Sequence, residues 1–153
     1  MIISHRKCNL EDIKMRYALM VVAVLSSSPA LSKLCKVQLS NGHQFAAPTA
    51  LTLNDQVKGL SGKNPINDRL IMAWDNPAVR SVWMRNTFIP LTAAFVGEDG
   101  KIQSLQDMKP NTDTAHSSLH PVIAIIEVSP KESARLGWKR GDYVTHSSCF
   151  TVK

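Results

Sequence analysis

The segment Trp83–Leu91 gathers four side chains that could bind a small ligand. Trp83 offers a flat aromatic ring, and Arg85, Asn86 and Thr87 follow with a guanidinium, an amide and a hydroxyl. Together these groups could hydrogen-bond an anionic or sugar-like ligand, with Trp83 as its apolar platform. The structural alternative is a turn in which Asn86 and Thr87 bind their own backbone, and this is the more common use of such residues.

Two carboxylates are candidates for a site of a different kind. Glu127 interrupts the apolar run Val122–Val128, where a carboxylate needs a partner or a raised pKa unless it occupies a paired position at a sheet edge. Asp107 and Glu127 could form the carboxylate pair that cleaves glycosidic bonds, although the sequence does not set their separation. Both are therefore ligand-binding candidates without an assigned catalytic role.

A nucleophilic hydrolase lacks its usual sequence signature, because the chain contains no Gly-x-Ser-x-Gly elbow. Ser117 or Ser118 could join His116 or His120 and a carboxylate in a catalytic triad, but only through tertiary contacts. No catalytic residue is assigned, and a binding or accessory role is favoured over an enzyme.

The histidines do not form a metal-binding motif. His116 and His120 are four residues apart, a spacing that suits a metal site on one face of a helix. They lie in a segment rich in serine and threonine that ends at Pro121, so helical geometry is not expected there. His43 and His146 are distant in sequence. We expect neither a metal nor another cofactor.

The segment 1–32 has the three parts of a secretory signal peptide: a basic start, a short apolar core at Tyr17–Leu25 and a small-residue end. Cleavage is expected before Lys33, and translation could begin at Met15. The nine residues of the apolar core are too few to cross a bilayer, which needs about 20 in a helix. The mature protein, residues 33–153, is therefore expected to be periplasmic or secreted, without a membrane span.

Cysteine use agrees with export. Cys8 leaves with the signal peptide, and Cys35 and Cys149 remain near opposite ends of the mature chain. The termini of compact domains are often close in space, so these two cysteines are predicted to form a disulfide in an oxidising compartment. Neither has the Cys-x-x-Cys spacing of redox enzymes or structural zinc sites.

Composition excludes a disordered chain and argues against a nucleic-acid-binding one. The 153 residues are 44% hydrophobic and 20% charged, close to the average of globular proteins. The net charge of +6 is spread along the chain, without the clustered lysines and arginines that bind phosphates. One ordinary domain fits this length, and no nucleic-acid partner is expected.

Short strands must position the candidate side chains. Apolar runs, alternating or continuous, predict strands at 34–39, 43–47, 70–74, 81–84, 91–96, 101–105, 122–128 and 143–146. Asn41-Gly42 and Asp99-Gly100 mark hairpin turns, and 110–119 is predicted to be a long exposed loop.

Helices are few. Residues 51–60 could form a short one, and the capping box of Ser129 and Glu132 predicts a helix at 130–136 that ends at Gly137. We therefore predict a mainly β, small single-domain, jelly-roll-like sandwich or barrel with one short helix near residues 130–136.

Several motifs follow one another in the order and spacing of a known family. They are Trp83–Leu91, Phe95–Ile102, Met108–Pro110, Ile126–Val128 and Leu136–Asp142. Over about residues 34–145, the chain resembles the family called domain of unknown function 192, also known as uncharacterised protein family 0127. The resemblance implies a small, mostly β, jelly-roll-like fold that is often exported from bacteria or archaea, and it brings no known reaction.

The chain also departs from the family pattern. Gly59–Lys63 replaces the usual Gly-Leu-Met-x-Arg, and Thr92 stands where members commonly carry an acidic residue. The sequence therefore predicts an exported binding or accessory module of the cell envelope, with an unknown ligand or an envelope protein as its partner. The alternative is an exported hydrolase that acts on an envelope polymer.

Overall fold

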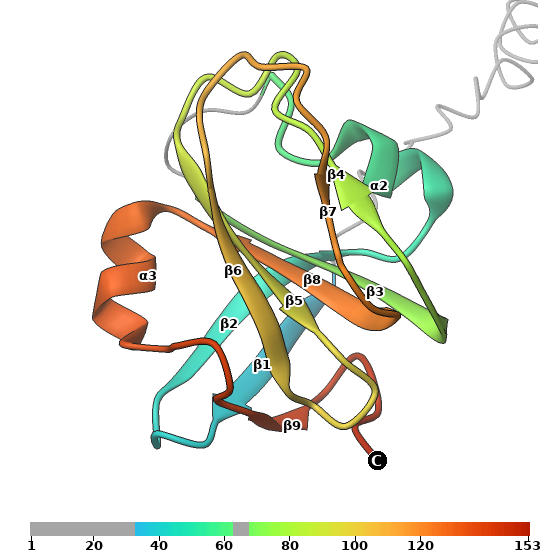
Figure 1. The fold of residues 1–153 in the computed structure, drawn as a ribbon, viewed down its shortest axis with the longest axis vertical. Coiled ribbons are helices and arrows are strands. Elements are labelled where there is room, and N and C mark those ends of the chain that lie inside the picture. The colour runs from blue at the N-terminus through green and yellow to red at the C-terminus, as the bar shows by residue number, and fades with distance from the viewer. Residues whose placement is uncertain (1–32, 63–67) are drawn as a thin grey trace, which may run out of the picture. The chain divides into compact units, whose positions relative to one another are not determined.

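The structure, a computed structural model, describes residues 33–62 and 68–153, so the signal peptide predicted at 1–32 lies outside the described residues. The described chain forms nine strands and two short helices, and the predicted mainly β fold is confirmed. In chain order the elements are β1 (Leu34–Leu39), β2 (Gln44–Ala50), α2 (Leu53–Lys58), β3 (Arg69–Ala78), β4 (Ser81–Val82), β5 (Leu91–Val96), β6 (Ile102–Met108), β7 (His116–Ser117), β8 (Val122–Val128), α3 (Pro130–Leu136) and β9 (Val144–Ser147) (Figure 1).

Seven strands form one curled sheet that resembles half of a barrel (Figure 1). Its order is β6-β5-β8-β3-β2-β1-β9, and each neighbouring pair is antiparallel except β2 and β3, which are parallel. The sheet curls far enough for its two ends to meet: the Val144 N–H at the start of β9 donates to the Gly100 carbonyl before β6, at 2.8 Å. β4 and β7 form a separate two-stranded sheet.

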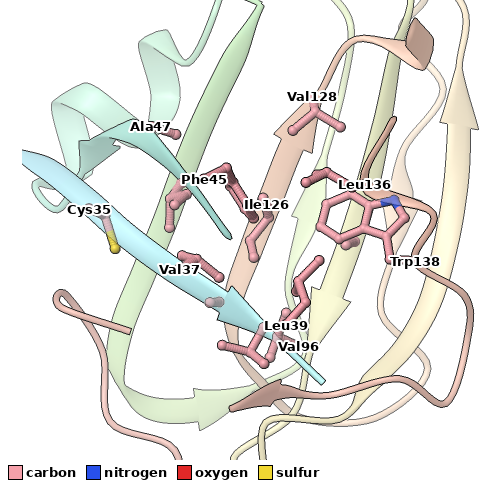
Figure 2. Close-up of a cluster of buried hydrophobic side chains, with 14 of the residues drawn as sticks. Cys35, Val37, Leu39, Phe45, Ala47, Val96, Ile126, Val128, Leu136 and Trp138 are labelled. Carbon is pink, nitrogen blue, oxygen red and sulfur yellow. The ribbon is translucent and has the colours of Figure 1, made fainter. Parts of the chain in front are cut away.

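The inner face of the curl holds the first of two apolar clusters (Figure 2). Ile126 and Val128 of β8 belong to it, and α3 closes it with Leu136. Trp138, just after α3, packs edge-on against Phe45 with ring centroids 6.2 Å apart. Burying aromatic rings in this way anchors α3 to the sheet.

The predicted signals set both ends of α3. Ser129 Oγ accepts a hydrogen bond from the Glu132 N–H, and Pro130 occupies the first turn, where its missing N–H is not needed. Gly137 ends the helix in the left-handed conformation, with a φ of 58°.

The outer face of β3, β5 and β8 carries the second apolar cluster. Ile125 points to this face and Ile126 to the inner one, because neighbouring residues of a strand alternate between faces. Leu60 after α2, Val82 in β4 and Met84 beyond it cover the outer cluster. β8 is therefore buried along its whole length, as its apolar run predicted.

Two predicted boundaries were wrong. β3 continues to Ala78 through Asp75-Asn76-Pro77, where a break between strands was expected, and its register against β8 shifts between Ala73 and Ala78. Such an irregularity accommodates a proline, which cannot donate to the ladder. Within the predicted exposed loop at 110–119, His116–Ser117 forms β7 against β4, and Ser118 is buried.

Cys35 on β1 and Cys149 beyond β9 are joined in a disulfide, with Cα atoms 5.5 Å apart. The bond ties the C-terminal segment to the first strand. Across residues 33–62 and 68–153, no helix has the length and apolar character needed to cross a membrane.

Candidate functional site

A cavity of about 210 Å³ lies between α2 and the outer face of the sheet. Its lining is mainly apolar and includes Leu53, Val57, Leu60, Met72, Trp74, Val82, Trp83, Met84 and Leu91. The polar and charged lining residues are Gln56, Lys58, Ser61, Arg80, Ser81, Arg85, Thr87 and Glu127. Mostly apolar walls with a few polar groups are typical of small-molecule sites.

Glu127 is the single carboxylate among these lining residues. It pairs with Leu70 of β3 and Ala93 of β5, so it lies in the interior of the sheet and not at a paired edge. The residue is 4% exposed, and burial raises the pKa of its carboxyl from 4.5 to about 7. No described residue donates a hydrogen bond that would lower this pKa. The carboxylate is therefore available to a donor that enters the cavity.

Gln56 of α2 fixes the structure around Trp74. Its Nε2 donates to the backbone carbonyls of Ala50 and Ala73, both at 3.3 Å, and its Oε1 accepts from the Trp74 indole N–H at 3.0 Å. These bonds hold α2 against β2 and β3 and orient the indole ring. The Arg80 guanidinium lies over that ring, 4.6 Å from its centroid.

Arg80 retains donors that no described residue uses. Its backbone N–H donates to Ser118 Oγ and its carbonyl accepts from the Ser118 N–H, so its position is fixed by the β4–β7 pair. In its side chain, Nη2 donates to the Asn76 carbonyl at 3.2 Å, and Nε is buried without a partner in the described chain. Because a guanidinium has five N–H donors, Arg80 can still bind an acceptor.

Glu127 and Arg80 line the same cavity but lie at different positions along β3. Leu70, Met72 and Trp74 alternate along one face of β3, and Glu127 lies opposite Leu70. The four residue-to-residue steps from Leu70 to Trp74 span about 13 Å of extended strand. The cavity therefore runs along β3, with a carboxylate at one end and a guanidinium stacked on Trp74 at the other.

The rim of the cavity is apolar and exposed. Leu53 and Val57 of α2 are 74% and 59% exposed, Trp83 is 50% exposed, and all three belong to the lining. Exposed large apolar side chains beside a cavity are typical of a binding site. An apolar group can therefore enter between α2 and Trp83.

Four of the six candidates predicted from the sequence line this cavity: Trp83, Arg85, Thr87 and Glu127. Arg85 is exposed, and its Nε donates to Asp113 at 2.8 Å, so part of its hydrogen-bonding capacity is already used. Thr87 is buried.

Asn86, the fifth candidate, has a role in the backbone. The Met84 carbonyl accepts from the Thr87 N–H at 3.0 Å and closes a turn in which Asn86 has a φ of 55°. Asparagine adopts this left-handed conformation more readily than most residues, which accounts for its place in the turn.

Asp107, the sixth candidate, lies on the opposite face of the sheet from Glu127. It pairs with Thr92, whose hydroxyl donates to its carboxylate at 2.7 Å, whereas Glu127 pairs with the next residue, Ala93. Since neighbouring residues of β5 alternate between faces, the two carboxylates point in opposite directions. They do not form a glycosidase pair, which must flank one bond.

The serines and histidines considered for a triad or a metal site are not in the cavity lining. Ser117 Oγ lies 2.7 Å from Ser81 Oγ, and His116 Nδ1 lies 3.3 Å from Gln106 Oε1. In the part of the chain that the structure describes, no group of three or more His, Cys, Asp or Glu is placed to hold a metal ion.

Three residues of the site were missed from the sequence: Gln56, Trp74 and Arg80. Trp74 carried a usable signal, because it continues the alternation of Leu70 and Met72 along the predicted strand. Gln56 and Arg80 had no such signal in the sequence, since their contacts come from packing between separate segments of the chain.

The sequence match to one protein family covers almost the whole described chain. The model of DUF192, described as "Uncharacterized ACR", matches residues 36–146. The chain belongs to the DUF192 family. The family resemblance seen in the sequence motifs is thereby confirmed.

Solved structures support the fold of this DUF192 protein. A protein of unknown function from Novosphingobium aromaticivorans DSM 12444 is 32% identical, with a TM-score of 0.65, over 74% of this chain and 84% of that chain. A protein described as a candidate transcription regulator, from Sinorhizobium meliloti 1021, is 22% identical, with a TM-score of 0.63, over 72% of this chain and 89% of that chain, and it shows similarity of fold alone. No curated protein matches the sequence.

Proposed function

We propose that this DUF192 protein is an exported binding module of the cell envelope that holds a small, largely apolar ligand in the cavity beneath α2. Glu127 carries the proposal, because it is a buried carboxylate that lines the cavity without a donor from the described residues. A ligand that donates an N–H or O–H to Glu127 would replace the hydrogen bonds that burial removes. The volume of about 210 Å³ favours a ligand with a single ring.

Export has two supports in the chain. The segment 1–32 has the composition of a signal peptide. The Cys35–Cys149 disulfide is of a kind that persists in oxidising compartments and is rare in the cytosol.

The hydrolase alternative has weaker support at this site. A carboxyl with a pKa near 7 suits a general base. However, Glu127 is the single carboxylate in the lining, and the lining contains no histidine beside the hydroxyls of Ser61, Ser81 and Thr87. A pair or triad mechanism would therefore lack a member, whereas binding needs only the groups that are present.

A screen of single-ring compounds by amide NMR tests the proposal on the mature protein, its Glu127→Gln variant and a Glu98→Gln control. Glu98 is a matched control because it undergoes the same chemical change, pairs with Lys153 and is absent from the cavity lining. We expect compounds that shift the amides of Met72, Met84 and Thr87, with weaker binding in Glu127→Gln and unchanged binding in Glu98→Gln.

Two results would overturn the proposal. One is a broad library in which no compound shifts those amides. The other is turnover of envelope fragments that Glu127→Gln abolishes, which would establish the hydrolase instead.

A further inference from the structure

Glu127 and Arg80, two polar groups of the cavity, need opposite kinds of hydrogen-bonding partner. Glu127, when ionised, only accepts hydrogen bonds, and Arg80 only donates them. The two side chains form no ion pair with each other, because Met72 and the length of β3 separate them. A ligand that satisfies both must therefore present a donor at one end and an acceptor at the other.

The apolar lining residues of the cavity favour a ligand whose central part is apolar. Met72 lies on β3 between the level of Glu127 and Trp74, and Met84 and Leu91 add further apolar lining. The amide of Gln56 is already engaged by Ala50, Ala73 and Trp74. A sugar would carry hydroxyls along its whole length and leave several of them unpaired against these walls. The apolar walls therefore favour an aromatic ring or an alkyl chain over a carbohydrate.

The charge of the lining favours an anion at the Arg80 end. Lys58, Arg80 and Arg85 are the cationic lining residues, and of these Arg85 is already paired with Asp113. A carboxylate matches the planar guanidinium and can take two parallel hydrogen bonds from it. This end of the ligand is therefore best matched by a carboxylate.

We infer that the cavity binds a small organic acid whose carboxylate meets Arg80, whose apolar body lies over Met72, and whose far end donates an O–H or N–H to Glu127. The inference rests on the proposed function and adds the chemical class of the ligand. Hydroxylated or aminated aryl and alkyl acids belong to this class.

Three related probes separate the two ends. Para-hydroxyphenylacetate has both groups, phenylacetate lacks the donor, and para-cresol lacks the carboxylate. At about pH 8, where Glu127 is ionised, we expect the mature protein to bind para-hydroxyphenylacetate about tenfold more tightly than either relative. Glu127→Gln should reduce the preference for para-hydroxyphenylacetate over phenylacetate and leave its preference over para-cresol unchanged. Arg80→Gln should reduce the preference over para-cresol and leave that over phenylacetate unchanged. Glu98→Gln should change neither preference.

The outcomes distinguish this inference from the function on which it rests. Equal affinities for the three probes in the wild type, or loss of both preferences in either variant, would refute the assigned ends. If the probes fail to bind while other single-ring compounds still shift the cavity amides, the ligand class is wrong and the binding site stands. Each variant's amide spectrum shows whether it is folded.

Discussion

Replacing Glu127 with glutamine should make the stability of the protein less dependent on pH. Burial raises the pKa of this carboxyl from 4.5 to about 7. Between these values the folded protein keeps a proton that the unfolded chain has lost, so stability falls as pH rises through this window and levels off above about pH 7. Each unit of pKa corresponds to about 1.4 kcal/mol, so ionised Glu127 destabilises the folded state by about 3 kcal/mol.

Urea unfolding of the mature protein with its disulfide intact measures this difference. Near pH 8, Glu127→Gln should be more stable than the wild type by up to about 3 kcal/mol, and near pH 5 the difference should shrink to about 1 kcal/mol or less. Glu98→Gln, at a partly exposed position, should follow the wild type at both pH values. A Glu127→Gln effect of the same size at both pH values would mean that the carboxyl titrates normally, which would refute the rise of its pKa by burial.

Three further predictions concern other parts of the chain. Asn86→Ala should lower the free energy of unfolding by about 1 kcal/mol, whereas Asn86→Gly should not, because the left-handed conformation strains alanine. Equal urea midpoints for the two variants would contradict this prediction. Replacing Cys35 and Cys149 with serine should destabilise the protein by about 2–5 kcal/mol, since the bond joins residues 114 positions apart; an unchanged thermal midpoint would count against it. Mass spectrometry of exported protein should find Lys33 as the first residue, and an intact chain beginning at Met1 in the cytosol would exclude the predicted export.

The strands and α3 could be predicted because their signals are local. The continuous apolar run of β8 predicted a strand covered on both faces, and the structure buries every residue of it. Ser129, Glu132 and Gly137 marked both ends of α3 within nine residues of sequence. By contrast, β7 has two residues, and its partner β4 lies far away in the sequence, with Ser81 and Ser117 separated by 36 positions. Nothing in the sequence of β7 itself therefore distinguished it from a loop.

The candidate site could be predicted only in part. Glu127 stood out because a carboxylate is costly in an apolar strand. The cavity around Glu127 could not be predicted, because it exists only where Gln56 holds α2 against β3 and where Arg80 stacks on Trp74. Asp107 was grouped with Glu127 on chemistry alone, and a register offset of one residue across β5 places it on the opposite face.

The most direct test of the binding proposal is the dissociation constant of the tightest single-ring ligand, measured by amide NMR near pH 8 for the wild type, Glu127→Gln and Glu98→Gln. If the ligand donates a hydrogen bond to Glu127, the dissociation constant should rise about tenfold in Glu127→Gln and stay unchanged in Glu98→Gln. Equal dissociation constants for all three proteins would show that the cavity carboxylate does not hold the ligand.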